Sequence, residues 1–199
     1  MSGKVWEVGG FLAGAILIAF GAVAIYMGID GRATVRDSLK QEGIVFGTAS
    51  DPAVAEHASQ WAGEQVLTGD QARAFALIMR EHALESSGGL TYAEMGRYTS
   101  AQNPDDPKGT NDLEAAKKDT KGLPVANSSR DVWVTATALS TALNMSYMAE
   151  QLALFGIVVG VALLLTGIGL VILAFAVFHR RPAETEAQVK GTTVTPVTG

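Results

Sequence analysis

Two histidines stand next to glutamates in the middle of the chain, and they are the first candidates for chemistry. His57 follows Glu56, and His82 follows Glu81. Imidazole and carboxylate groups together bind zinc or iron. Neighbouring residues on a helix point about 100° apart, however, so Glu81 and His82 do not face one point, and the two histidines would have to meet across two helices. We therefore expect no metal ion and no cofactor, and a partly buried His82 on the apolar side of its helix.

Other patterns that could carry chemistry are weak or missing in the sequence. The chain has no cysteine, which excludes disulfides, thiol catalysis and cysteine metal sites. It lacks the motifs of serine hydrolases, nucleotide-binding loops and zinc proteases. Glu7 lies near one end of an apolar segment, where a proton or ion role is the alternative to simple solvation. Asp105 and Asp106 indicate a solvated turn, because the ligand spacing of a calcium loop is absent. We expect no enzyme activity.

The stretch from Gly88 to Glu94 looks like a motif, and helix capping explains it. Gly88 and Gly89 are placed to end the preceding helix. Thr91 and Glu94 form a capping box, and apolar residues flank the box at the positions of a hydrophobic staple. These features predict a compact helix–turn–helix. Contact with a ligand is the alternative.

The elements that hold these residues depend on the last apolar stretch of the chain. Leu152–Phe178 contains 27 residues without a charge. That length makes about 40 Å of helix, whereas a bilayer core needs about 20 residues. Arg180 and Arg181 follow at once and favour the cytoplasmic side, and Pro182 ends the helix. The sequence therefore predicts a transmembrane helix over residues 151–178.

A second apolar segment lies near the start, over residues 5–29. The run Ala22-Val23-Ala24 has the form of a signal-peptide cleavage site, but the apolar segment continues past it. Length favours an uncleaved span. Residues 1–4 and a disordered tail over residues 179–199 are then cytoplasmic, and residues 30–150 form an extracytoplasmic helical domain. We expect a multi-pass protein of the plasma membrane, with lipid around it.

The two apolar segments share a pattern of small residues at steps of 4, 3, 4, 3 and 4, which keeps to one face of a helix. The first run is Gly10, Gly14, Leu17, Gly21, Ala24 and Gly28, and the second is Gly156, Gly160, Leu163, Gly167, Leu170 and Ala174. Small residues on one face allow two helix backbones to approach closely in lipid. The pattern predicts an antiparallel hairpin packed along these glycines. Another membrane protein or a second copy of the chain is an alternative partner, and the general abundance of glycine in membrane helices is a third explanation.

The segment between the spans is acidic and predicts short helices. It carries 17 acidic and 11 basic residues, which argues against nucleic acid as a partner. We expect helices over about 51–61 and 70–84, and a weak one over 111–121. Ser128 and Asp131 indicate the start of one helix of roughly 50 residues that continues through the second span.

The sequence Ala76-LIMREHALESSGGLTYAE-Met95, lying between two spans, resembles a family of small actinobacterial membrane proteins. The matching positions are His82, Gly88, Gly89, Thr91, Tyr92, Ala93 and Glu94. The resemblance implies two spans and an outward helical domain. Members are often labelled automatically as aromatic ring-opening dioxygenases. Such enzymes are soluble and hold iron with two histidines and a glutamate of a separate large subunit, a set that this sequence does not supply.

These observations predict an all-α membrane protein, with two antiparallel transmembrane helices and a small helical extracytoplasmic domain between them. The expected function is that of a non-catalytic accessory or assembly subunit of a larger membrane complex. The alternative is a sensor module that binds a ligand and signals through a partner. A membrane-anchored metalloenzyme is the third possibility and has the least support.

Overall fold

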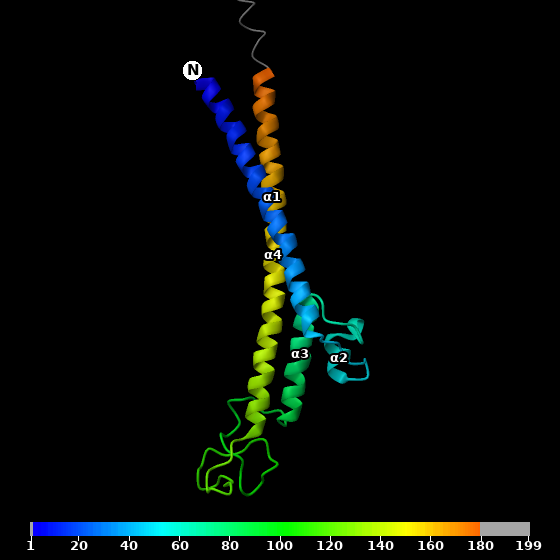
Figure 1. Cartoon of the computed structure of the whole chain (residues 1–199), viewed down its shortest axis with the longest axis vertical. Helices are drawn as coiled ribbons and strands as arrows, with labels where there is room; N and C mark the ends of the chain where they lie inside the picture. The colour runs from blue at the N-terminus through cyan, green and yellow to red at the C-terminus, as the bar shows by residue number, and fades with distance from the viewer. Residues whose placement is uncertain (1, 180–199) are drawn as a thin grey trace, which may run out of the picture. The chain divides into compact units, whose positions relative to one another are not determined.

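The computed structural model is all-α and describes residues 2–179, with the side chains of residues 8–176 (Figure 1). Its elements, in chain order, are α1 (Ser2–Glu42), α2 (Pro52–His57), a 3-10 helix η1 (Ser59–Trp61), α3 (Gly69–Ser86) and α4 (Ser128–His179). The expectation of two long apolar helices running antiparallel, with small helices between them, is confirmed. The expected cytoplasmic tail lies almost entirely outside the described residues.

The chain divides into two compact units. Residues up to Asp30 form the first unit together with those from Ala153 onward, and Gly31–Leu152 form the second. The first unit consists of the two apolar helical segments, with the start of α1 and the end of α4 at the same end (Figure 1). α1 and α4, the helices that contain these segments, are both long and apolar enough to cross a membrane. Only 11% of the most apolar stretch of each helix is buried. Their apolar side chains therefore face outward, unlike those of a core helix in a soluble protein.

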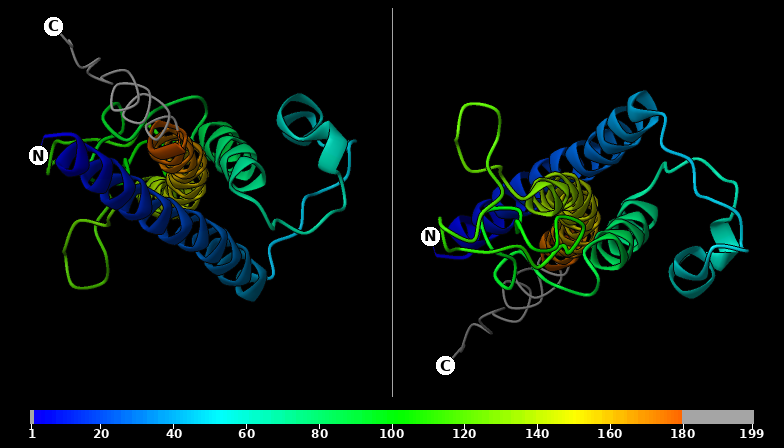
Figure 2. Two further views of the ribbon diagram at one scale, coloured as in Figure 1. Left: turned by 90° about the horizontal axis from the view of Figure 1, so that it is seen from above. Right: turned by 90° about the horizontal axis from the view of Figure 1, so that it is seen from below.

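The second unit packs around α3. Its hydrophobic core takes residues from α1, α2, α3, α4 and the segments between the first three of them, namely Leu39, Phe46, Ala53, Val54, Ala58, Val66, Ala72, Ala74, Ala76, Ile78 and Leu143. The ring of Phe46 stacks on Trp61 at 6.0 Å and meets Phe75 edge-on at 5.6 Å. Within this unit α3 lies between α4 on one side and α2 with η1 on the other (Figure 2).

Local capping interactions set the bounds of the short helices. The Asp51 side chain accepts a hydrogen bond from the N–H of Ala53, and Pro52 lies in the first turn of α2. α3 begins with a capping box, because the Thr68 side chain accepts the N–H of Gln71 and the Gln71 side chain accepts the N–H of Thr68. It ends as expected at Gly88 and Gly89, which have φ of 63° and 81°.

These glycines close α3 with paired backbone hydrogen bonds. The N–H of Gly89 donates to Leu84 O at 2.7 Å, and the N–H of Gly88 donates to Glu85 O at 3.1 Å. This is the Schellman arrangement, in which left-handed residues satisfy the last free carbonyls of a helix. Glycine is the residue that adopts such φ values without steric cost.

The predicted helix–turn–helix after Gly89 is wrong, because residues 91–94 form a single turn. Glu94 Oε2 accepts both the N–H and the hydroxyl of Thr91, at 2.8 and 2.7 Å. The hydroxyl therefore donates to the carboxylate and does not accept the N–H of Glu94, as a helix N-cap would. Half of the capping box forms without a helix to follow it.

The predicted weak helix over residues 111–121 is also wrong. This segment consists of bends and turns, and two of its residues join neighbouring segments through isolated bridges, Ala116 with Ser100 and Lys118 with Pro124. The start of α4 agrees with the sequence to within one residue. Asn127 is the capping side chain, because its Oδ1 accepts the N–H of Ser129 at 3.1 Å. From there α4 runs for 52 residues, as the expected long helix does.

Candidate functional site

A groove runs along one face of α3 and α4 in the 31–152 unit. Its outer part has a volume of about 530 Å³ and its inner part about 510 Å³, and Met79 lines both. α4 lines it with Asp131, Val132, Thr135, Ala136, Leu139, Ala142, Leu143 and Ser146. From Val132 to Ser146 a helix extends about 21 Å. We call this surface the α3/α4 groove.

The α3/α4 groove is mostly apolar, with polar groups near its ends. Val45, Val132 and Leu139 are 54%, 45% and 48% exposed, although they lie outside the apolar first unit. His82, Ser86 and Asp131 line its outer part, and Ser38 and Glu42 line its inner part. In other proteins, exposed apolar surfaces of this kind often bind a protein segment or a small molecule.

His82 belongs to an ion pair at the edge of this groove. Its Nε2 lies 3.1 Å from Oδ2 of Asp51, the residue that caps α2. The side chain is 48% exposed, which is less buried than expected, and it lines the groove together with Met79 and Ala83. Burial acts to raise the pKa of the Asp51 carboxyl, but the Ala53 N–H and His82 outweigh it, and the pKa falls below its ordinary value.

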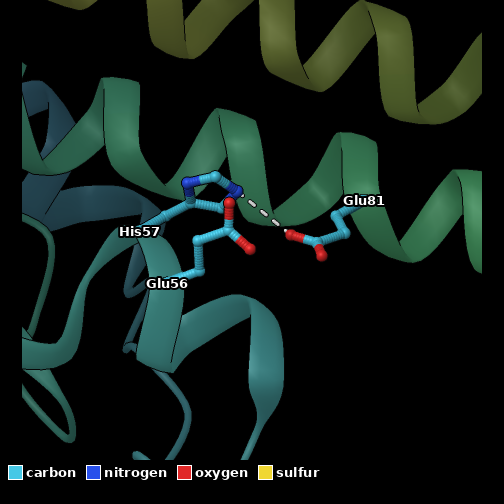
Figure 3. A group of neighbouring side chains, drawn as sticks. All are labelled: Glu56, His57 and Glu81. Carbon is cyan, nitrogen blue, oxygen red and sulfur yellow. Dashed lines mark ion pairs between the residues drawn. The ribbon is translucent and has the colours of Figure 1, made fainter.

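A second histidine–carboxylate group joins the same two helices. His57 Nε2 lies 3.0 Å from Oε2 of Glu81, and the Glu56 carboxylate completes a group whose ligand atoms lie within 4.8 Å of one another. Figure 3 shows the three side chains converging from α2 and α3. The two histidines belong to separate pairs, and neighbouring Glu81 and His82 take part in different ones. Each meets a carboxylate across the α2–α3 contact instead, which the sequence analysis missed.

The segment from Gly88 to Met95 is tied to the start of α4. Trp133 Nε1 donates to Leu90 O at 2.7 Å, and Arg130 donates to Met95 O at 2.8 Å. The Arg130 guanidinium also lies 3.9 Å from the centre of the Tyr92 ring. The N–H and then the hydroxyl of Thr91 lower the pKa of the Glu94 carboxyl. These contacts give Tyr92 and its neighbours structural roles in joining α3 to α4.

A buried carboxylate joins three helices where the second unit begins. Glu150 is 9% exposed, and its Oε1 accepts hydrogen bonds from Nε and Nη2 of Arg32 at 3.2 and 3.1 Å. Its Oε2 accepts the N–H of Gly69 at the start of α3. A Cβ on Gly69 would lie 2.8 Å from both Glu150 Oε2 and Tyr147 Cα, so this close approach requires glycine. Nothing in the sequence pattern links these three residues.

The glycines of the two apolar runs lie between α1 and α4 within the first unit. A Cβ on Gly21 would lie 2.6 Å from Gly160 O, and one on Gly167 would lie 2.6 Å from Gly14 O. A Cβ on Gly28 would lie 2.6 Å from Ala153 O. The contacts are looser at Gly10 and Gly156, where an added Cβ would lie 3.9 Å from Ala174 Cβ and 3.8 Å from Ala24 O. A further partner must therefore use a surface other than the tight part of these runs.

Comparisons with models of protein families, with curated proteins and with solved structures find no match to this chain.

Proposed function

We propose that this chain is a two-span protein of the plasma membrane, with both termini in the cytoplasm and residues 31–152 outside. It acts without catalysis, as an accessory or assembly subunit of a larger membrane complex. Support for the membrane location comes from two helices of sufficient length whose apolar side chains remain exposed. Support for the orientation comes from Arg180 and Arg181 after the second span.

The observation that carries the functional proposal is the α3/α4 groove. Lipid can cover the apolar faces of the first unit, but the groove belongs to the 31–152 unit, outside both proposed spans. Leu139 is half-exposed at its centre, and Val132 and Val45 are half-exposed along it. Apolar side chains that stay exposed along a continuous groove favour a surface that another molecule covers.

A helical segment of a partner protein is the occupant that best fits this groove. A groove about 21 Å long matches about four turns of helix. Amphipathic helices bind in such grooves through apolar anchors spaced three, four and seven residues apart. The acidic side chains near the two ends, Asp131 and Glu42, favour a partner helix flanked by basic residues.

The test is purification of the tagged full chain from native membranes in mild detergent. Wild type is compared with Leu139→Asp, which places a charge in the groove, and with Val134→Asp. Val134 is 54% exposed on the same helix and does not line the groove, so it is a matched control. We expect a stoichiometric partner with wild type and with Val134→Asp, and loss of that partner with Leu139→Asp. Recovery of the wild-type chain alone would contradict the proposal.

A ligand-sensing function is the second candidate, and the volume of the groove favours it. Small-molecule sites commonly enclose about 300–1,000 Å³, a range that includes both parts of the groove. Such a ligand would be largely apolar, with a polar group placed near His82 or Asp131. A ligand that raises the melting temperature of wild type and of Val134→Asp, but not of Leu139→Asp, would favour the sensor over the assembly subunit.

A further inference from the structure

We propose that Glu56, His57 and Glu81 bind a divalent first-row transition-metal ion, which joins α2 to α3. This site is separate from the α3/α4 groove, because neither part of the groove is lined by any of the three residues. The inference therefore does not depend on the proposed function.

The separation of the donor atoms fits two ligands of one ion. Zinc lies about 2.0–2.2 Å from histidine nitrogen and carboxylate oxygen. Two ligands at right angles around such an ion are then about 3.0 Å apart, and two at tetrahedral angles about 3.4 Å. His57 Nε2 and Glu81 Oε2 are 3.0 Å apart. Glu56 is exposed, and its ligand atom lies within 4.8 Å of the other two, so the proposal requires its side chain to turn toward them when the ion binds.

Glu81 Oε2 is placed to be the second ligand of such an ion. This oxygen is shielded from solvent and accepts no hydrogen bond from any group in the described part of the chain. It lies close to His57 Nε2, yet no hydrogen bond joins the two atoms. A shielded carboxylate oxygen needs a hydrogen-bond donor or a cation beside it, and either a protonated His57 or a metal ion held between the two side chains would supply one. The half-buried side chains of His57 and Glu81 hold the two donor atoms in place, and Figure 3 shows Glu56 beside them.

The donor set selects the class of metal. One imidazole with two carboxylates suits zinc, manganese, iron or nickel, whereas magnesium and calcium prefer oxygen ligands alone. Three protein ligands leave at least one position for water. Because α2 has only six residues, an ion that joins its last turn to α3 would hold the helix firmly in place.

The experiment uses the full chain in detergent, with the purification tag removed and metals stripped by a chelator. Calorimetry with Zn²⁺, Mn²⁺ and Mg²⁺ measures binding to wild type, His57→Gln, Glu81→Gln and His82→Gln. The last is the matched control, because His82 forms the parallel ion pair with Asp51 on the same two helices. We expect one Zn²⁺ per chain, at least tenfold weaker binding with His57→Gln and Glu81→Gln, and unchanged binding with His82→Gln.

Two further results are decisive whatever the folding of the variants. Co²⁺ added to the wild-type chain should give visible absorption bands of a site with nitrogen and oxygen ligands, and Zn²⁺ should remove them. Zn²⁺ should also raise the melting temperature of the wild type and of His82→Gln. Zn²⁺ binding no tighter than Mg²⁺ binding to the wild type would overturn the inference. Equal weakening by His82→Gln and His57→Gln would do the same, because it would indicate adventitious binding by surface histidines.

Discussion

Replacing Gly21 with alanine tests the helix contact in the first unit most sharply. The new Cβ would lie 2.6 Å from Gly160 O and 2.8 Å from Leu164 N. Both are backbone atoms, which cannot rotate away as the end of a side chain could. An ordinary carbon–oxygen contact in closely packed helices is about 3.4 Å, so α1 and α4 must separate locally by about 0.8 Å.

The size of the effect follows from comparison with Gly9, where a Cβ would meet nothing within 4 Å. Glycine to alanine in a helix stabilises it by up to about 1 kcal/mol. Overpacking a close contact costs about 1–3 kcal/mol. Helix propensity contributes to both variants and largely cancels in their difference. We therefore expect Gly21→Ala to be less stable than Gly9→Ala by about 1–3 kcal/mol.

The assay is unfolding of the full chain in mixed micelles with increasing SDS, followed by circular dichroism. The same comparison on the other helix uses Gly160→Ala, whose Cβ would lie 2.8 Å from Gly21 O, with Gly169→Ala as control. A Cβ on Gly169 would meet nothing within 4 Å. Equal free energies of unfolding for Gly21→Ala and Gly9→Ala would refute the close helix contact.

Three further predictions concern the 31–152 unit. Glu150→Gln should lower the free energy of unfolding by about 1–3 kcal/mol, because it leaves the half-exposed Arg32 without its charged partner; an unchanged thermal unfolding curve would contradict this role. The lowered pKa of Glu94 means that the charged carboxylate stabilises its turn at neutral pH, and this stabilisation is lost as the pH falls through the lowered pKa. Hydrogen-exchange protection of the Thr91 amide should therefore decrease in acid, and it should decrease at neutral pH in Glu94→Gln. Thr120→Cys, in a chain without native cysteine, should react with a membrane-impermeant maleimide in intact cells, whereas reaction only after permeabilisation would reverse the proposed orientation.

The long helices and their mutual contact could be predicted because one-dimensional patterns determine them. An uninterrupted apolar run specifies α4 without knowledge of its neighbours, and small residues on one face specify where another helix can approach. Gly14, Gly21, Gly160 and Gly167 lie at close approaches between α1 and α4. The end of α3 at Gly88 was equally local, because a left-handed residue there requires glycine.

The histidine pairs and Glu150 could not be predicted because they depend on how α2, α3 and α4 pack. His57 meets Glu81, 24 positions later, and Arg32 meets Glu150 across 118 positions. No sequence spacing encodes such contacts.

The predicted helix over residues 111–121 failed for a related reason. Its composition allowed a helix, but its backbone forms hydrogen bonds with distant segments instead. The Lys117 N–H, for example, donates to Thr99 O. At Thr91 and Glu94 the capping residues satisfy each other within one turn, so their pairing does not require a helix.

The α3/α4 groove is central to the functional proposal, and photo-crosslinking in living cells tests it most directly. A photoreactive amino acid is placed at Leu139, inside the groove, and in a second strain at Val134, outside it. The proposal predicts one discrete adduct with a membrane protein from position 139 and none from position 134. No adduct from position 139, or the same adducts from both positions, would contradict it.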